Sequence, residues 1–348
     1  MAADTITLQE LKTGDIMLFS PTDEAISKLI VFVTHSKVSH TGMVDYNPAY
    51  IINEQGEGAM RRLLGAPGER TIYIRRLKNA PDTSKVVDIA MEYVNEQLPY
   101  PKSNLFFLGI YVLAGEFIPD TLTGELIKNL LRVVCYELIK LVNEKRFPGV
   151  DTPMVCSQFA AFCYDQAALK YGPEYKIHYN DKVATVPSLI RTILDQLIKE
   201  PEKTYRLDAP KKGLLGEVEE ELMSAEECCG KLLEHLTKNH LMAGASQEAE
   251  DGVMKASDEM MTARPTKVSD EVIAAVYQYG RLLLALFGSK ELGEDAKTVS
   301  AKEIQEVLEE LLRFQETFVT PEDLLSNTTN LEDMGILTYT QEEVDERK

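Results

Sequence analysis

The sequence predicts an α+β fold in which a small antiparallel sheet, formed by the N-terminal part of the chain, is covered by helices. Two observations lead to this expectation. Short apolar runs bounded by turn residues fill the N-terminal part, which is typical of strands in a meander. Further along the chain, apolar residues recur three and four positions apart, which is the spacing of helices with one buried face.

Four strands are expected from these runs, at residues 16–19, 40–46, 50–54 and 71–76. Gly14 and Asp15 form a turn signal before the first strand, and Asn47 and Pro48 supply the turn between the second and the third. A helix is expected over 25–34, because its apolar positions fall on one face. The second and third strands therefore fold back on one another as a hairpin.

Residues 153–164 are predicted to begin a helix that carries a cysteine in its first turn. Apolar residues at 155, 159, 162 and 163 recur at helical spacing, and Pro153 is compatible with a helix entry. The unpaired N–H groups and the dipole at such an N-terminus favour a thiolate, so Cys156 is a candidate nucleophile. The alternative is a structural cysteine, because free cysteines usually behave as small core residues.

The composition excludes several classes of partner. The net charge is −19, which argues against nucleic acid and against broad adhesion to an anionic membrane. The most apolar window, 105–118, is too short to span a bilayer and contains Glu116. No secretory signal is visible, so we expect a cytoplasmic protein, with a secreted effector that lacks a conventional signal as the alternative. The five cysteines match no zinc spacing, so neither a metal nor a cofactor is expected.

A cysteine nucleophile needs a histidine as its base, and the chain has five. His40 is favoured because it begins a strand directly after a loop, from where it can point towards the N-terminus of a helix packed on the sheet. The turn at 47–48 brings Glu54 back beside His40, where its carboxylate can orient the imidazole. His35 is the main rival as the base, and Glu57 replaces Glu54 if the register slips.

Four motifs occur in a fixed order, at residues 14–19 (GDIMLF), 39–44 (SHTGMV), 52–54 (INE) and 156–159 (CSQF). In this order they resemble the circularly permuted papain-like cysteine hydrolases, and more narrowly the YiiX-like branch of the permuted NlpC superfamily, which is related to lecithin retinol acyltransferase. In ordinary papain-like enzymes the cysteine helix precedes the histidine strand. Here the histidine, the acidic residue and the cysteine follow one another, as in the permuted group.

The resemblance implies a permuted papain-like fold and a triad in which Cys156 is the nucleophile, His40 the general base and Glu54 the orienting residue. The implied activity is acyl transfer through a thioester on an amide or ester bond, by an amidase, a peptidase or a lipid acyl hydrolase. The substrate would be a small amide, a peptide or a lipid ester. The alternative is a catalytically inactive papain-like scaffold that serves as a protein-interaction module.

Three further residues are expected to contact the substrate: Asp15, Tyr100 and Ser157. Tyr100 follows a proline and resembles a tyrosine-containing motif that the family places before the nucleophile. The sequence departs from the family at Gln158, where the family has glutamate. The family's closing segment has two candidates here, at 186–189 and at 320–324.

The domain organisation is expected to comprise a catalytic domain over 1–210, an acidic helical module over 211–317 and a tail over 318–348. The tail returns to the catalytic domain if the later closing segment is the correct one. Residues 99–148 form a helical insertion or a lid. The apolar stretch 104–142 is expected to pack on the sheet, with contact to a lipid as the alternative. The helical module either completes a core or binds a protein partner.

Overall fold

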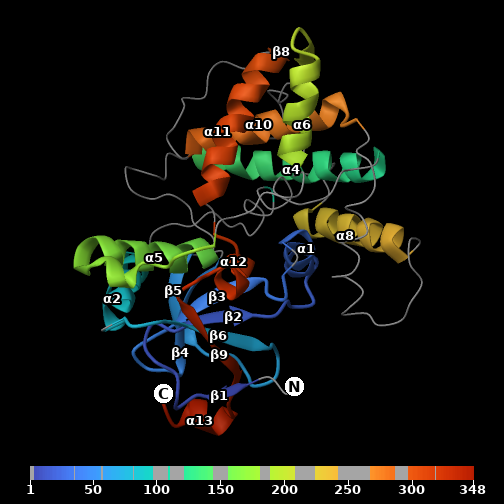
Figure 1. Ribbon diagram of the computed structural model, residues 1–348. Helices are drawn as coiled ribbons and strands as arrows, with labels where there is room; N and C mark the ends of the chain where they lie inside the picture. The colour runs from blue at the N-terminus through green and yellow to red at the C-terminus, as the bar shows by residue number, and fades with distance from the viewer. Residues whose placement is uncertain are drawn as a thin grey trace.

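The computed structural model describes most of the 348-residue chain. The described residues are 4–34, 36–55, 58–80, 82–96, 109, 121–143, 156–180, 189–207, 224–241, 267–286, 297–317 and 319–348. They form a seven-stranded, mostly antiparallel sheet, a two-stranded sheet and a set of helices, which confirms the α+β class (Figure 1).

The large sheet has the strand order β1-β9-β6-β2-β3-β4-β5. Its strands are β1 (Thr5–Thr7), β2 (Ile16–Phe19), β3 (His40–Val44), β4 (Tyr50–Gln55), β5 (Gly58–Leu63), β6 (Ile72–Leu77) and β9 (Leu331–Thr338). Neighbouring strands are antiparallel except for β1 and β9, which are parallel. The four predicted strands correspond to β2, β3, β4 and β6.

The helices form a separate layer above the sheet in Figure 1 and also flank the sheet itself. They are α1 (Ala25–Thr34), α2 (Ser84–Glu96), α4 (Thr121–Asn143), α5 (Cys156–Tyr171), α6 (Leu189–Lys199), α8 (Ala225–Leu241), α10 (Asp270–Leu286), α11 (Ala301–Thr317), α12 (Pro321–Ser326) and α13 (Gln341–Asp345). A short 3-10 turn, Pro173–Tyr175, follows α5, and β7 (Thr204–Arg206) pairs with β8 (Thr298–Ser300) beside the helical layer.

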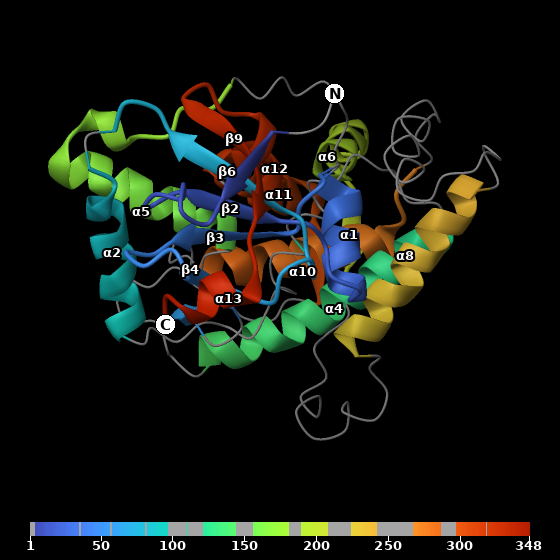
Figure 2. The same ribbon diagram turned by 90° about the horizontal axis from the view of Figure 1, so that it is seen from below.

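Alternation along the strands gives the large sheet two distinct buried faces. One face carries Leu18 and Met43 and packs against α5, α2 and α12. The other face carries Phe19 and Val44 and packs against the N-terminal segment and α13, which lies in front of the strands in Figure 2. Because both faces are covered, most of the strand residues are apolar and the pattern in β2 is a continuous buried run.

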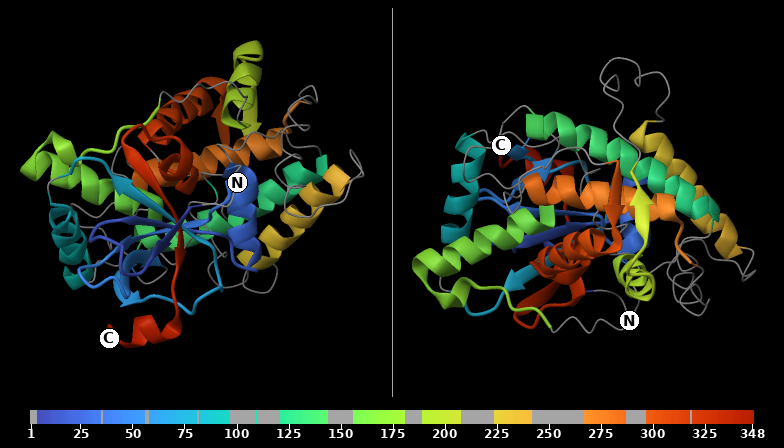
Figure 3. Two further views of the ribbon diagram at one scale, coloured as in Figure 1. Left: turned by 60° about the horizontal axis from the view of Figure 1, so that its bottom comes forward. Right: turned by 90° about the horizontal axis from the view of Figure 1, so that it is seen from above.

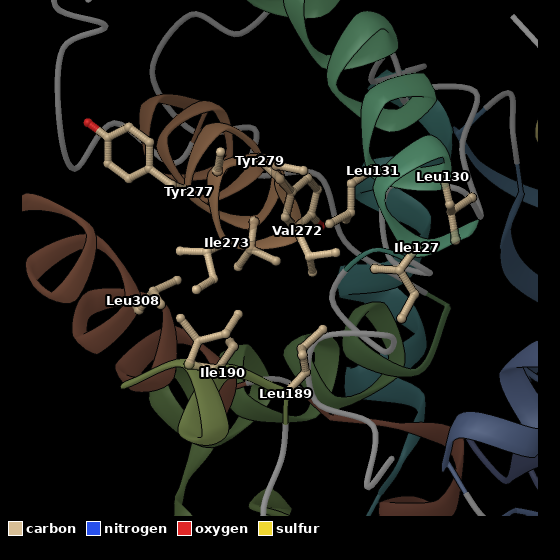
Figure 4. Close-up of a cluster of buried hydrophobic side chains, with 14 of the residues drawn as sticks. Ile127, Leu130, Leu131, Leu189, Ile190, Val272, Ile273, Tyr277, Tyr279 and Leu308 are labelled. Atoms are coloured by element: carbon tan, nitrogen blue, oxygen red, sulfur yellow. The ribbon is translucent and has the colours of Figure 1, made fainter. Parts of the chain in front are cut away.

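The helical layer has a core of its own. Seen from above in Figure 3, the long helix α4 (green) lies alongside α10 (orange), and the two are in contact. Side chains of α4, α6, α10 and α11 converge between the helices (Figure 4). Helices α8 and α1 add buried residues to the same core. Residues 189–206, which the sequence analysis grouped with the N-terminal domain, therefore share their core with the helical layer.

The later parts of the chain are used in two ways. The described helices of 211–317, which are α8, α10 and α11, turn apolar faces into the helical core, and the described part of 104–142 does the same through α4. Residues 319–348 instead return to the sheet, because β9 lies between β1 and β6. Thr320 caps α12 in a capping box with Asp323 (Thr320 N to Asp323 Oδ2, 2.8 Å), and Leu324 and Leu325 of this later closing segment pack into the core of the sheet. Residues 186–188 of the earlier candidate lie outside the described residues.

The apolar segment before Cys156 is only partly described. Residues 99–108, 110–120 and 144–148 of the predicted insertion lie outside the described residues. Among the helices in the described ranges, none is both long enough and apolar enough to cross a bilayer.

The return of the C-terminal strand can be tested at Gly335, which has φ +94° in β9. A Cβ there would lie 2.2 Å from the carbonyl oxygen of Asp4, next to β1, so Gly335→Ala adds a backbone clash to the strain of positive φ. Gly68 also has positive φ, but a Cβ at that position would have no neighbour within 4 Å. We expect Gly335→Ala to lower the free energy of unfolding by about 2 kcal/mol more than Gly68→Ala. Urea unfolding measures both, and equal losses would contradict the placement of β9.

Candidate functional site

Cys156 is the first residue of α5, and it is partly exposed and not in a disulfide. Helix α5 contacts β3 and β4 and buries Phe159, Cys163 and Tyr164 on the sheet face that carries Leu18. The hydroxyl of Tyr164 donates to the carbonyl of Gly14, just before β2, at 2.6 Å. This bond fixes the middle of α5 at the beginning of β2.

The first turn of α5 is held by the C-terminal segment. Ser157 is fully buried, and its Oγ donates to the carbonyl oxygen of Val319 at 2.6 Å. A buried hydroxyl that is bonded to the backbone positions the helix and is not available to a substrate. The prediction that Ser157 contacts the substrate is therefore replaced by a positioning role.

His40 is the first residue of β3 and pairs with Phe19, the last residue of β2. The two rings lie 5.7 Å apart between centroids and are tilted by 48°. The Nε2 atom of His40 lies 2.9 Å from Nδ2 of Asn53, so the amide and the imidazole are hydrogen-bonded. Asn53 is buried, and its Oδ1 has no hydrogen-bond partner among the described residues. Because an amide nitrogen only donates, Nε2 is the acceptor of this bond and Nδ1 carries the hydrogen of the neutral imidazole.

The register of the hairpin explains why Asn53 and not Glu54 stands beside His40. Val44 pairs with Ile51 and Gly42 with Asn53, which puts position 54 opposite position 41. The sequence analysis had placed position 54 beside position 40, one residue out of register. Successive residues of a strand alternate between faces. A shift of one residue in the register therefore puts Asn53, in place of Glu54, on the face that carries His40. Glu54 lies in β4 opposite Ala59, and the orienting residue in the structure is Asn53.

Arg70 connects the ends of these elements. Its Nε donates to the carbonyl of Ser20 at 2.5 Å, its Nη2 donates to Ser39 Oγ at 3.1 Å, and its guanidinium lies 5.2 Å from the centroid of Phe19. Burial lowers the pKa of Arg70 to about 10, and attraction to Cys156 opposes that change. Arg70 is thus at the end of β2 and within electrostatic range of the Cys156 sulfur.

These contacts define where the site lies. Tyr164 holds α5 at the beginning of β2, whereas Cys156 interacts with Arg70 at the end of β2. Helix α5 packs on β3 and β4, with its middle held at the beginning of β2. Alternation places His40 with Phe19, on the face opposite the one that α5 covers. His40 and the cysteine helix therefore lie on opposite faces of the sheet.

His40 is not positively charged in this structure, although a protonated imidazole would stabilise a neighbouring thiolate. Burial lowers its pKa to about 3, and the positive charges of Arg70 and Arg62 contribute to this decrease. The imidazole is therefore neutral near pH 7.

The remaining predicted residues are not gathered at this site. Asp15 is buried in an ion pair with Arg76 (Oδ2 to Nη2, 2.6 Å) and accepts a bond from the backbone of Lys12, so it stabilises the turn before β2 instead of contacting a substrate. Tyr100, His35 and Glu57 lie outside the described residues. Within the described ranges, no group of three histidine, cysteine or acidic side chains is close enough to hold a metal ion.

Comparisons with known proteins add no assignment: neither a protein-family model nor a curated protein matches this chain. Two site residues were missed by the sequence analysis. Asn53 could have been found by counting the hairpin register from Asn47. Arg70 lies in the loop before β6, and no local pattern marks it.

The neutral state of His40 predicts a dependence of stability on pH. The unfolded chain binds a proton with the ordinary histidine pKa of about 6.5, whereas the pKa of folded His40 is about 3. Between these values the unfolded state binds more protons, so acid destabilises the fold. We expect the free energy of unfolding to fall more steeply in the wild type than in His40→Gln between about pH 7 and about pH 4. Urea unfolding at each pH checks this, and parallel pH dependences would contradict it.

Proposed function

We propose that this protein is a cysteine-dependent hydrolase or acyltransferase that acts through a thioester on an amide or ester bond. The observation that carries the proposal is the arrangement at one end of the sheet. The thiol at the N-terminus of α5 lies within electrostatic range of Arg70, and Arg70 donates to Ser39, the residue before His40, which is itself hydrogen-bonded to Asn53. A nucleophile, a base and an orienting residue are the groups that this chemistry needs.

The order of the motifs supports the same proposal. His40 and Asn53 precede Cys156 along the chain, as in the permuted papain-like hydrolases of the YiiX-like branch, which these motifs resemble. The closing segment at 320–324 adjoins the cysteine helix through Val319. The proposal includes membership of that fold family. It also includes a small amide, peptide or lipid-ester substrate and a cytoplasmic location.

The proposed reaction begins with the thiol. The N-terminus of α5 and the charge of Arg70 both favour the thiolate of Cys156, so only a weak base is needed to remove the thiol proton. For His40 to accept this proton at Nδ1, the Asn53 amide turns so that its Oδ1, which has no partner among the described residues, accepts from Nε2–H; the sulfur then attacks the acyl carbonyl. Backbone N–H groups in the first turn of α5 stabilise the oxyanion.

Collapse of the tetrahedral intermediate breaks the bond to the leaving group. His40 gives its proton to that group, and the environment that keeps its pKa low makes the imidazolium a ready acid. The acyl group then remains on sulfur as a thioester. Water, or another nucleophile in the acyltransferase case, attacks the thioester and returns the thiol.

The first test is the pH dependence of alkylation of Cys156 by iodoacetamide, with the site located by peptide mass spectrometry. We expect the wild type to react well below the ordinary thiol pKa of about 8.5, and Arg70→Gln to move the profile towards that value. Arg70→Lys keeps the charge and is the matched control. His40→Ala should leave the profile close to the wild type, because a neutral imidazole contributes little attraction to the thiolate.

Turnover is measured on a panel of activated esters and peptide anilides. Cys156→Ser should abolish it, and His40→Ala should lower kcat by about 10²-fold or more. Full turnover in Cys156→Ser would overturn the enzyme proposal. An ordinary thiol profile that Arg70→Gln does not change would overturn the role of Arg70.

The orienting residue is tested by comparing two neighbours in β4. Asn53→Ala should lower kcat by about tenfold or more with a smaller change in KM, because the imidazole loses its hydrogen bond. Asn53→Asp, which keeps the acceptor that the turned amide presents to Nε2–H, should recover part of the loss. Glu54→Ala, one position along the strand, is the control for local damage. The opposite ranking would restore Glu54 as the orienting residue, and thermal unfolding of each variant confirms that it is folded.

A further inference from the structure

Helix α1 lies between β2 and β3 along the chain but packs on the helical layer. Its apolar residues Leu29, Ile30 and Phe32 are buried in the helical core, and among the described residues the two cores that cover the sheet do not include them. Its neighbour is α8, which lies close to it in Figure 1. Because α1 leads into the loop that carries Ser39 and His40, it connects the helical layer to the start of β3.

The N-terminus of α1 is capped from α8. Oε1 of Glu226, in the first turn of α8, accepts a hydrogen bond from the backbone N–H of Ala25 at 2.7 Å, across 201 positions of sequence. Ala25 is the first residue of α1, where backbone N–H groups have no partner within the helix. A carboxylate at this end also interacts favourably with the helix dipole. Glu226 thus holds the first turn of α1 from the helical layer.

The same turn of α1 is bonded to the residue before His40. Ser27 is the third residue of α1. Its Oγ accepts from the N–H of Thr22 at 3.0 Å and lies 2.7 Å from Oγ of Ser39. Ser39 is buried, and its Oγ also accepts from Nη2 of Arg70 at 3.1 Å. The hydroxyl of Ser39 is therefore held from α1 on one side and from the loop before β6 on the other.

These bonds fix the backbone at the start of β3. The N–H of Ser39 donates to the carbonyl of Phe19 at 2.9 Å, and Phe19 is also the residue that His40 pairs with across β2 and β3. The imidazole then accepts from the amide of Asn53 at 2.9 Å. A hydrogen bond depends steeply on distance and angle, so a small displacement of Ser39 changes the bond that orients His40.

We propose that Ser27 is a positioning residue for His40 and that Glu226 holds Ser27 in place, so that the helical layer sets the geometry of the candidate base. Each step from α8 to β3 is a hydrogen bond or a covalent connection within the first turn of α1 or between Ser39 and His40. The consequence for turnover rests on the proposed function, whereas the coupling itself does not. Displacement of α8 would release the first turn of α1 and, with it, His40.

The test observes the imidazole of His40 by a carbon–proton correlation spectrum of protein labelled in its histidines. The chain has five histidines, and the His40 signal is the one that His40→Gln removes. We expect Glu226→Ala to shift this signal, and Ser27→Ala to shift it further because Ser27 is the nearer residue. Glu226→Gln keeps an oxygen that accepts from the N–H of Ala25, and Ser27→Thr keeps the hydroxyl. Both conservative variants should leave the signal close to its wild-type position.

Glu227→Ala is the matched control, because Glu227 is the next residue in the first turn of α8 and carries the same charge. Its carboxylate pairs with Lys231, one turn along α8, at 3.0 Å. The His40 signal should therefore stay in place in Glu227→Ala. A signal that does not move in Glu226→Ala would overturn the coupling. Equal shifts in Glu226→Ala and Glu227→Ala would also overturn it, since the effect would then come from overall charge or from the stability of α8.

A double-mutant cycle tests whether Glu226 acts through Ser27. Glu226→Ala should add little to the shift that Ser27→Ala already causes, and additive shifts would contradict this path. Thermal unfolding of each variant shows that it is folded.

Turnover on the panel of esters and anilides separates this inference from the proposed function. Ser27→Ala should lower kcat by about threefold or more with little change in KM, because the base is displaced and not the substrate, and Ser27→Thr should restore it. An unchanged kcat in Ser27→Ala would overturn the positioning role. If the wild type has no turnover, the proposed function fails, and the spectra of Glu226→Ala and Glu227→Ala still decide the coupling.

Discussion

The hydrogen bond between Ser157 and the carbonyl of Val319 joins residues that are 162 positions apart, and the candidate site depends on it. Val319 precedes the cap of α12, and α12 leads into β9, which lies between β1 and β6 in the sheet. The turn that carries Cys156 is therefore fixed by the C-terminal end of the chain. The helical layer lies between these parts in sequence and has its own core, so it can vary without changing the sheet that holds the cysteine helix.

Electrostatics then sets what the site can do. Burial keeps His40 neutral and also lowers the pKa of Arg70, which lies within electrostatic range of Cys156. A guanidinium stays positive over a wider range of pH than an imidazolium would. Serine hydroxyls support the arrangement, since Ser27 and Ser39 are bonded at 2.7 Å and Ser39 accepts from Arg70. Ser27 lies in α1, which reaches the helical core, so the loop before β3 is braced from that side.

Much of the fold could be predicted from local pattern. The runs that became β2, β3, β4 and β6, and the cysteine helix, were found because each is a period-two or helical pattern of apolar residues. Strand β5 was missed because Arg61 and Arg62 interrupt its apolar pattern. Strand β9 was missed because its apolar pattern is interrupted by Glu332, Asp333 and Gly335. Both are strands because their backbones complete the ladders of β4 and β6, which is a property of their neighbours.

The sequence by itself determined the mixed class, the helix that begins at Cys156 and the candidate base at His40, because each is set by residues close together in the chain. The tertiary structure decided the rest. A single step in the register of the β3–β4 hairpin put Asn53 and not Glu54 beside His40, and burial with two nearby arginines lowered the pKa of that histidine. Register, burial and the field of distant charges depend on pairs of residues that the chain brings together only when it folds, so local pattern carries no record of them.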